Sequence, residues 1–220
     1  MKQLFSLESV LDVGCGAGAW LAVWKENNTV IAGLDGDYVN RDGLYIEKEE
    51  FIPQDLSKPF NLDRKFSLVQ SLEVAEHLPT ETSSQFVADL CSHADIVFFS
   101  AAPPGQGGDN HVNEQKYEFW RQLFVEQKYI PLDIIRTQFA NNKSVERWYR
   151  YNSFVYVSQE IFDGLPEKIK TLEIKREIQD ISPPVYKLRK AFIRLIPIFV
   201  ATKIAKVKEN TSLLLFRMKG

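Results

Sequence analysis

Short runs of apolar residues alternate along this chain with segments of helical periodicity. The first run, SVLDVG (9–14), leads into AGAWLAVWKENN (17–28), whose apolar residues recur on successive helical turns. Further apolar runs stand at 29–35, 49–56, 65–72 and 94–102, and further helical periods at 80–93 and 113–127. The run ADIVFFSAA is the most strand-like of these, because it is β-branched and aromatic and is closed by PPGQGG.

The later part of the chain adds two strands and then changes in composition. We predict strands at 129–139 and 152–160, paired antiparallel, with an aromatic RWYRYN stretch in the connection between them. Strands that alternate with helices in this way predict a doubly wound α/β domain, with a parallel sheet covered on both faces. The sequence therefore predicts a domain over 1–163 and a helical, basic appendage over 164–220.

Composition is that of an ordinary globular protein. Hydrophobic residues make up 45% of the 220 positions and charged residues 25%, which supplies a sizeable core and excludes intrinsic disorder. The net charge of −2 gives no indication of nucleic-acid binding. Cys15 and Cys91 have no metal-finger spacing and are typical of reduced thiols in a cytoplasmic protein. Neither a signal peptide nor an apolar run of the ~20 residues that span a membrane is found in the sequence.

A glycine-rich loop follows the first predicted strand. Gly14, Gly16 and Gly18 permit a tight turn and the close approach of a ligand to the backbone. Asp35 ends the second strand, at the edge of the sheet where such folds bind ligands, and its carboxylate suits the two hydroxyls of a ribose. These features leave the cofactor open, because Gly14, Gly16 and Ala19 also satisfy the dinucleotide fingerprint G-x-G-x-x-G/A.

Asp12 separates the two classes of cofactor. It stands two residues before Gly14, where a carboxylate would repel a pyrophosphate but would favour a cationic amino acid and a sulfonium. S-adenosylmethionine carries both of these positive charges and no phosphate. The pattern D-x-G-x-G-x-G resembles that of class I S-adenosylmethionine-dependent methyltransferases, and the similarity covers roughly residues 9–158. The resemblance implies a methyltransferase with a sheet of order 3-2-1-4-5-7-6 and one antiparallel strand.

The same resemblance implies the other contacts with the cofactor. Asp35 in GLD would bind the ribose, Asp55 in QDL would take the adenine amino group, and Leu56 would flank the adenine. The backbone at the end of the fourth strand, near Leu72, would meet the methionine part. Only about eight residues precede the first strand, whereas the family normally has a covering helix there. We therefore expect either a cover from elsewhere in the chain or an open acceptor pocket.

The loop after the fifth strand carries the candidate catalytic residues, His111 and Glu114. Transfer of a methyl group to a hydroxyl requires a base or a metal that removes the proton. Asn113, in the same loop, is expected only to cap the next helix, and His93 to lie at a solvent-facing helix end. The GGxxHxNEQ string followed by FWRQLF resembles bacterial methyltransferases of sugar and glycan pathways. The sequence thus predicts O-directed transfer to a small molecule or glycan intermediate.

An alternative reaction uses a divalent metal such as Mg²⁺, Mn²⁺ or Zn²⁺. Glu73, Glu76 and His77 are spaced i, i+3, i+4, on one face if the segment is helical, and His111 could supply a fourth ligand. This E-x-x-E-H pattern resembles the metal site of small-RNA 2′-O-methyltransferases and of ubiquinone-pathway O-methyltransferases, but it also occurs in metal-free relatives. The catalytic region has no strong basic patch that would favour RNA. A domain that binds the cofactor without chemistry is the third alternative.

Positive charge is concentrated near the C-terminus. Residues 181–208 hold seven basic side chains and no acidic one, and subtracting these seven from the net −2 leaves −9 on the rest of the chain. Apolar residues recur beside them at helical spacing: Leu188, Phe192, Leu195, Ile196 and Phe199. Such a helix predicts peripheral contact with an anionic membrane surface. The alternative is that the apolar stripe packs on the catalytic domain while the lysines face water.

Overall fold

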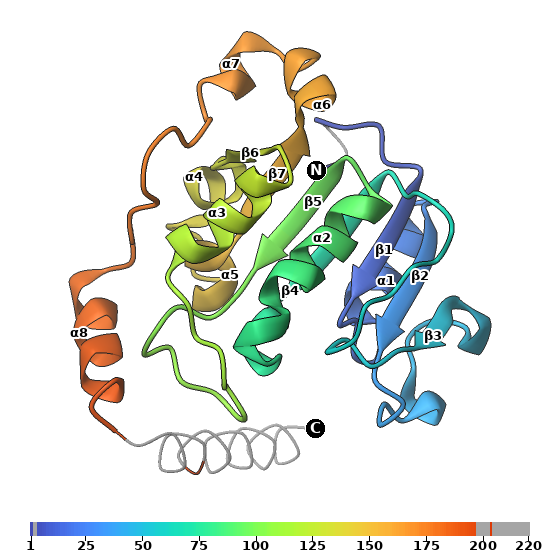
Figure 1. Cartoon of the computed structure of the whole chain (residues 1–220), viewed down its shortest axis with the longest axis horizontal. Coiled ribbons are helices and arrows are strands. Elements are labelled where there is room, and N and C mark those ends of the chain that lie inside the picture. Colours follow the sequence, from blue (N-terminus) through green and yellow to red (C-terminus); the bar gives the residue numbers. More distant parts are fainter. Residues whose placement is uncertain (2–3, 197–202, 204–220) are drawn as a thin grey trace.

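Seven strands form one sheet in the order β3-β2-β1-β4-β5-β7-β6 (Figure 1). The computed structural model describes residues 1, 4–196 and 203 of the chain. Neighbouring strands run parallel except for β7, which is antiparallel to both β5 and β6. The strands are β1 (Ser9–Val13), β2 (Val30–Asp35), β3 (Phe51–Pro53), β4 (Leu68–Leu72), β5 (Ile96–Ser100), β6 (Tyr129–Leu132) and β7 (Phe154–Ser158). The predicted fold class and strand order are therefore confirmed.

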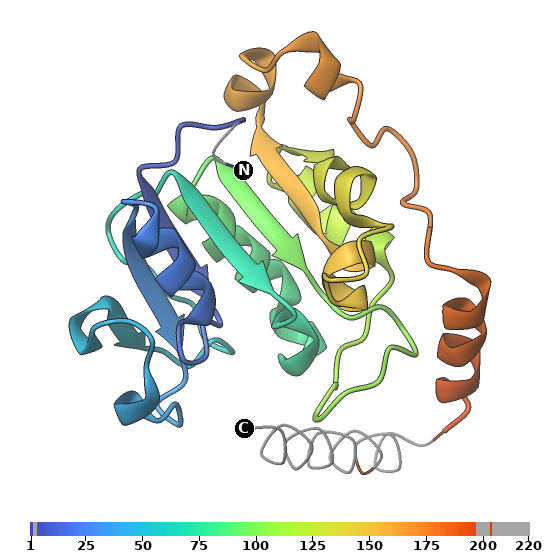
Figure 2. The same cartoon turned by 180° about the vertical axis from the view of Figure 1, so that it is seen from behind.

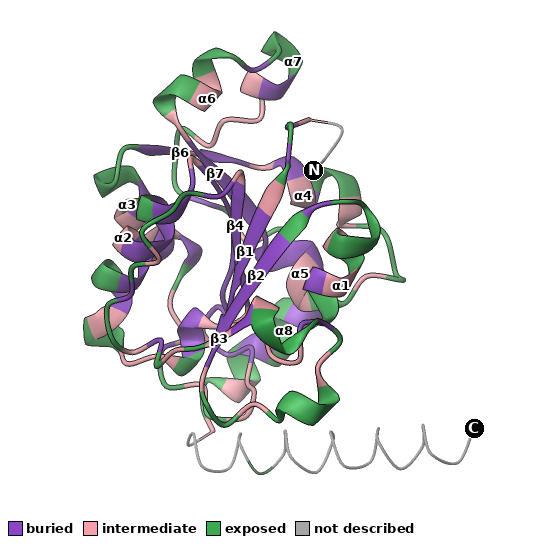
Figure 3. Cartoon of the chain, turned by 90° about the vertical axis from the view of Figure 1, so that its right-hand side faces the viewer, coloured by how far each residue is buried: buried purple, intermediate pink, exposed green. Residues whose placement is uncertain are grey.

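Helices cover both faces of this sheet, as opposite views show (Figures 1 and 2). One face carries α2 (Ser83–His93) and α3 (Tyr117–Glu126), and the other carries α1 (Ala19–Glu26), α4 (Ile134–Phe139) and α5 (Arg147–Asn152). Because both faces are covered, the central strands are buried along nearly their whole length (Figure 3). This explains why the sequence shows them as continuous apolar runs.

Two hydrophobic cores lie on the two sides of the sheet. The core beneath α2 and α3 is rich in aromatic residues: the rings of Phe124 and Tyr156 stack with centroids 3.8 Å apart, and Phe99 meets Phe124 edge-on at 5.2 Å. The core beneath α1 and α4 is built mainly from aliphatic side chains such as Leu21 and Ile134. Together the cores hold the carboxyl ends of β1, β2, β4 and β5 at one edge, where ligands of such sheets bind.

The late strands are shorter than predicted. Residues 129–132 and 154–158 do pair antiparallel, but the predicted strand 129–139 ends at Leu132 and continues as α4. The RWYRYN stretch, which is placed in the connection between the late strands, forms helix α5. In α4 the guanidinium of Arg136 bonds the carboxylate of Asp133 at 2.6 Å and lies over the ring of Phe154 at 4.5 Å. The i,i+3 pair with Asp133 and the contact with the distant Phe154 favour the helix over the strand that the local β-branched composition predicts.

The prediction that His93 faces solvent is wrong. Its side chain is buried, stacks on Phe60 with ring centroids 5.2 Å apart, and accepts a hydrogen bond from the backbone N–H of Leu62 at 3.0 Å. His93 thus anchors the 60–66 segment to the end of α2. It has a structural role and lies away from the ligand edge.

Short helical elements complete the chain. Four single turns of 3₁₀ helix are η1 (Arg41–Gly43), η2 (Lys48–Glu50), η3 (Ala75–His77) and η4 (Thr80–Thr82), and β7 is followed by α6 (Gln159–Asp163), α7 (Glu167–Lys170) and α8 (Pro184–Ile193). Residues 164–180 run back along the sheet: Leu132 bridges to Glu173, and the Ile174 N–H donates to the Pro131 carbonyl at 2.9 Å. Leu165, Ile169 and Ile178 enter the cores. The first part of the predicted appendage therefore packs against the domain.

The C-terminal region beyond α8 is largely outside the described residues, and the predictions that concern Phe199 and the positions after Lys203 fall there. Within the part of the chain that is described, no helix has the length and apolarity needed to cross a bilayer.

Candidate functional site

The glycine loop is shaped by contacts that exclude side chains. Gly14 has φ of 85°, and a Cβ there would lie 2.3 Å from Cγ2 of Val74. Gly18, also at positive φ, caps the start of α1 against Ile46. By contrast, nothing lies within 4 Å of where a Cβ on Gly16 would stand, although its φ is 53°. Gly14 and Gly18 are therefore required by packing, while Gly16 leaves open space above the loop.

Asp35 ties this loop to the end of β2. One carboxylate oxygen accepts the backbone N–H of Gly16 at 2.7 Å. The other accepts the N–H of Gly36 at 2.7 Å and the phenol of Tyr38 at 2.5 Å. The ring of Tyr38 is 84% exposed and stands over this carboxylate. The predicted ribose-binding acid is thus in place, together with a tyrosine that the sequence analysis did not single out.

A cavity of about 900 Å³ opens at this edge of the sheet. It is lined by Gly14, Gly16 and Asp35, by Asp55 and Leu56 after β3, and by Glu73, Val74, His77, Leu78 and Pro79 after β4. Five of the eight predicted cofactor-binding residues therefore share one cavity. Asp12 and Gly18 lie behind its wall, and the side chain of Leu72 lines a different cavity. Asp55 is exposed and accepts the Ser57 hydroxyl at 2.6 Å, so its carboxylate stands at the rim.

Asp12 lies beneath the glycine loop, 2% exposed, in register with Gly33 of β2 and Gln70 of β4. Burial raises the pKa of its carboxyl to about 7; the Gln70 amide offsets part of this effect and the nearby Asp35 carboxylate adds to it. The Oδ2 atom has no hydrogen-bond partner among the described residues. A cation above the loop would stabilise the ionised form of this carboxylate. The residues of the cavity therefore fit a ligand with a positively charged amino acid part, as S-adenosylmethionine has.

Glu114 organises the loop that carries His111. Its carboxylate accepts the backbone N–H groups of Gly105 at 2.6 Å and Gly107 at 2.7 Å, and it bonds Nδ1 of His111 at 2.9 Å. Burial alone would raise the pKa of Glu114, but the hydrogen bonds from His111, Gly105 and Gly107 bring it below its ordinary value. The structure therefore places Glu114 behind His111, where it orients the imidazole.

His111 lies beside the segment that follows β4. The Glu76 carbonyl accepts hydrogen bonds from the Val112 and Asn113 N–H groups at 2.9 and 3.0 Å, which draws the loop onto η3. The rings of His77 and His111 meet edge-on with centroids 4.9 Å apart. His77 lines the cofactor cavity, whereas His111 is half-buried behind it. Burial and the neighbouring His111 lower the pKa of His77, which favours the neutral imidazole.

Glu76, His77 and His111 each offer one ligand atom within 4.8 Å of the others. Glu76 is fully buried, neither of its carboxylate oxygens has a hydrogen-bond partner among the described residues, and burial together with the Glu73 carboxylate raises its pKa well above the ordinary value. Glu73, which the sequence grouped with Glu76 and His77, is not part of this cluster. Only Ala75–His77 form a helical turn, and Glu73 has φ of 59°, so its side chain does not share their face.

Glu73 instead belongs to a buried network of polar side chains. Its carboxylate accepts the Gln106 amide at 2.6 Å and the Asn152 amide at 3.2 Å. Asn152 also donates to the Gln106 amide oxygen at 2.7 Å and accepts the Tyr117 hydroxyl at 2.9 Å. This network joins the ends of β4 and β5 to α5 and α3. Of this network, the sequence analysis singled out only Glu73, for a different role; Gln106 is visible in the sequence as a large polar residue inside a glycine-rich loop.

The expectation that Asn113 caps the next helix is wrong, since α3 begins after Lys116. Asn113 is 1% exposed, and its amide donates to the Ser83 hydroxyl at 2.9 Å while its carbonyl accepts the Thr80 hydroxyl at 2.8 Å. The side chain thus fastens the His111 loop to the start of α2. Asn113 therefore helps to hold the His111 loop in position, although it does not line the cavity itself.

A second cavity of about 590 Å³ lies between α1 and the pair α4 and α5. Its walls are mainly apolar and aromatic, and include Trp20, Trp24, Leu72, Phe98 and Tyr149. Trp20 and Tyr149 meet edge-on with ring centroids 5.4 Å apart. This cavity is lined by side chains of α1, α4 and α5 and is distinct from the cavity at the glycine loop.

Comparison with known proteins agrees with this geometry. A family model described as a methyltransferase domain matches residues 2–159. No curated protein sequence matches the chain.

Two solved structures illustrate the likeness of fold. DesVI of Streptomyces venezuelae is 18% identical with a TM-score of 0.52, over 69% of this chain and 84% of that one. The sugar N-methyltransferase KedS8 of Streptoalloteichus sp. is 17% identical with a TM-score of 0.55, over 69% of this chain and 80% of that one. The glycine loop, the strand order and the family match lead to one conclusion. The chain belongs to the methyltransferase domain family and is a class I S-adenosylmethionine-dependent methyltransferase.

Proposed function

We propose that this enzyme methylates a hydroxyl group of a small-molecule or glycan acceptor. The observation that carries the proposal is the continuous contact from the cofactor cavity to a half-buried acid: His77 lines the cavity, His111 packs against His77, and Glu114 bonds His111. A hydroxyl must lose its proton when it is methylated, and imidazoles held in this way are suited to accept it. The sugar N-methyltransferase with the same fold makes sugars the first class of acceptor to test.

Different residues bind the cofactor, accept the proton and stabilise the resulting charge in the proposed reaction. Bound S-adenosylmethionine supplies an electrophilic methyl group, and Asp35, Asp55 and the glycine loop hold the cofactor at the strand ends. The acceptor oxygen gains the methyl group as the carbon–sulfur bond breaks, and its proton passes to the imidazole pair. Glu114 stabilises the positive charge that the pair then carries, because its carboxylate is hydrogen-bonded to His111. Alignment of the acceptor with the methyl group supplies much of the remaining rate enhancement.

The experiment supplies labelled S-adenosylmethionine and a panel of hydroxylated and aminated sugars, and identifies the methylated atom. We expect an O-methyl product, and we expect His77→Ala and His111→Ala to lower the rate by about 10²–10⁴-fold without changing cofactor affinity. Gln115→Ala is the control, since Gln115 lies in the same loop outside the His77–His111–Glu114 arrangement. An N-methyl product formed at the same rate by both histidine variants would contradict the proposal.

A metal-assisted version of the same transfer is the second candidate. It is favoured by the Glu76 carboxylate, which is fully buried beside His77 and His111. A carboxylate and two imidazoles suit Mn²⁺ or Zn²⁺, which would lower the pKa of an acceptor hydroxyl. Calorimetric titration with Zn²⁺ tests this version. We expect Glu76→Gln to abolish binding and Glu73→Gln, a matched control outside the cluster, to retain it. Equal Zn²⁺ binding by the Glu76→Gln variant would exclude the site.

A further inference from the structure

Helix α8 leaves an apolar stripe in solvent. The side chains of Val185, Leu188, Phe192 and Leu195 are 81%, 72%, 65% and 82% exposed. Their spacing of three, four and three residues places them along one side of the helix and of the turn that continues it. Exposed apolar residues elsewhere in the described chain are mostly scattered singly, which is normal for a protein surface. A continuous stripe of four is characteristic of an interaction surface.

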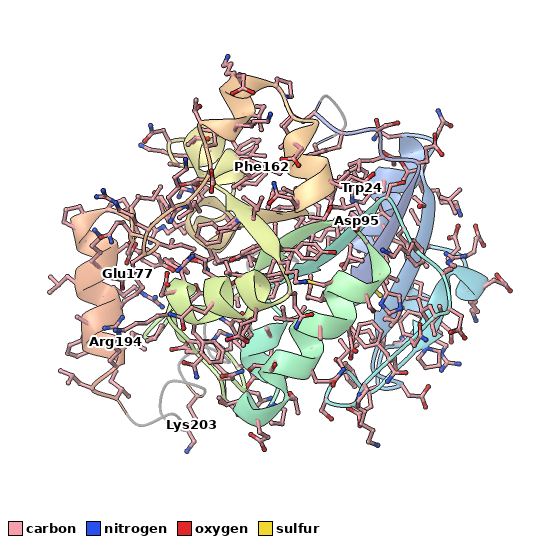
Figure 4. The ribbon with its side chains drawn as sticks, turned by 45° about the horizontal axis from the view of Figure 1, so that its top comes forward. Trp24, Asp95, Phe162, Glu177, Arg194 and Lys203 are labelled. Atoms are coloured by element: carbon pink, nitrogen blue, oxygen red, sulfur yellow. The ribbon has the colours of Figure 1, made fainter. Side chains whose placement is uncertain are left out.

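The inner side of α8 is formed by the buried Tyr186 and by charged side chains, so the apolar stripe does not pack on the described domain, contrary to the alternative that the sequence left open. Lys190 is 2% exposed and its ammonium bonds the Asp180 carboxylate at 2.5 Å. The Arg189 guanidinium donates to the Gln106 carbonyl at 2.9 Å, and that of Arg194 donates to the Pro104 carbonyl at 2.8 Å. Figure 4 shows Arg194 on α8 at the edge of the molecule. Tyr186 and the charged side chains therefore hold the helix, and its apolar stripe has no cover among the described residues.

Helix α8 packs against the loop that follows β5 and leads to His111. A Cβ on Gly105 would lie 2.1 Å from the Lys190 carbonyl, so only glycine lets the helix approach this closely. Gly105 is also one of the residues whose N–H is held by Glu114, and Glu114 in turn holds His111. The orientation of α8 is thus fixed relative to the acceptor side of the site.

The charge of this region determines which partner fits. Residues 181–208 contain seven basic side chains and no acidic one, while the rest of the chain carries −9. Lys187 and Lys203 are exposed. An apolar stripe with an exposed lysine such as Lys187 beside it complements an anionic lipid surface, where apolar side chains enter the acyl boundary and lysines meet the headgroups. A second copy of the chain would bring the same positive charge to the contact and would be repelled.

We propose that α8 docks this methyltransferase on an anionic bilayer through Val185, Leu188, Phe192 and Leu195. The helix lies in the plane of the headgroups in this arrangement, and its inner side stays on the loop that contains Pro104 and Gln106. The proposal goes beyond the methyl transfer and does not depend on the identity of the acceptor.

The experiment is co-sedimentation of the full chain with vesicles of phosphatidylcholine alone or mixed with phosphatidylglycerol. We expect binding only to the mixed vesicles, and weaker binding as salt rises from about 0.05 M to about 0.5 M, since the Debye length shortens. Leu188→Ser and Phe192→Ser should each weaken binding on the order of tenfold. Val125→Ser, which changes an exposed apolar side chain on α3, is the matched control and should bind normally.

The substituted side chains are exposed, so the variants should unfold at the temperature of the parent chain. Failure of the parent chain to sediment with the mixed vesicles would overturn the proposal, as would undiminished binding by the Leu188→Ser and Phe192→Ser variants. A dimer in solution that these substitutions dissociate, without vesicle binding, would assign the stripe to a second copy instead. Methyl transfer in solution is measured separately, so these outcomes leave the proposed reaction untouched.

Discussion

Substitution of Asp12 by asparagine should stabilise the free protein and weaken its binding of the cofactor. The pKa of Asp12 rises from the ordinary 3.8 to about 7 because the carboxyl is buried beneath the glycine loop. Between these pH values the folded chain keeps a proton that the unfolded chain has lost. The folded state is therefore penalised as pH rises from about 4 to about 7, and this penalty is absent below pH 3.8.

The size of the effect follows from the two pKa values. A difference of about 3 pH units, at about 1.4 kcal/mol each, amounts to roughly 4 kcal/mol at pH 8. At pH 5 the pH is only about 1.2 units above the pKa of 3.8 that the carboxyl has in the unfolded chain, so the penalty is roughly 1.6 kcal/mol. Asparagine has no proton to lose at this position. The gain in unfolding free energy from Asp12→Asn should thus be about 2.5 kcal/mol larger at pH 8 than at pH 5.

Urea unfolding of the cofactor-free protein at the two pH values measures this difference, and any constant effect of the amide cancels between them. Asp63→Asn, at an exposed position, is the control and should show no pH-dependent gain. Cofactor affinity should fall on the order of 10-fold or more in the Asp12→Asn variant, because a charge that favours the cationic ligand is lost. Equal gains in stability at pH 5 and pH 8 would refute the account of Asp12.

Three further predictions concern the loops and the core. Gly14→Ala should destabilise the fold by about 1–3 kcal/mol in thermal unfolding, since its Cβ would collide with Val74. Gly16→Ala should mainly weaken cofactor binding, measured by calorimetry. An equal loss of stability in the two variants would contradict these different roles. Glu114→Gln should reduce amide protection of Gly105 and Gly107 in hydrogen exchange and slow methyl transfer at unchanged cofactor affinity. Trp120→Ala should lower the free energy of unfolding by about 3–5 kcal/mol, because the side chain is buried. A loss below about 1 kcal/mol would show that the aromatic core contributes little to the stability of the fold.

The sequence by itself determines the fold and the cofactor loop of this protein, because both depend on local signals. Central strands covered on both faces must be apolar throughout, and a tight turn at positive φ after a strand favours glycine. Asp35 could be placed for a related reason: it ends a strand, and the ends of parallel strands meet at one edge. These features require no knowledge of which distant residues come together.

The acceptor side was decided only by tertiary contacts. Spacing alone grouped Glu73 with Glu76 and His77, but the positive φ of Glu73 and its bonds to Gln106 and Asn152 take it out of the cluster. Residues that make this network are 33 to 79 positions apart in the chain, so no local pattern reveals them.

The orientation of α8 was likewise beyond the sequence. Periodicity shows that one side of a helix is apolar, but it does not show which side meets the protein. Here the backbone carbonyls of Pro104 and Gln106 accept hydrogen bonds from arginines, and Asp180 pairs with a buried lysine. These polar partners exist only once β5, α3 and the returning segment 164–180 are assembled, and their hydrogen bonds turn the charged side of the helix inward and its apolar side to solvent.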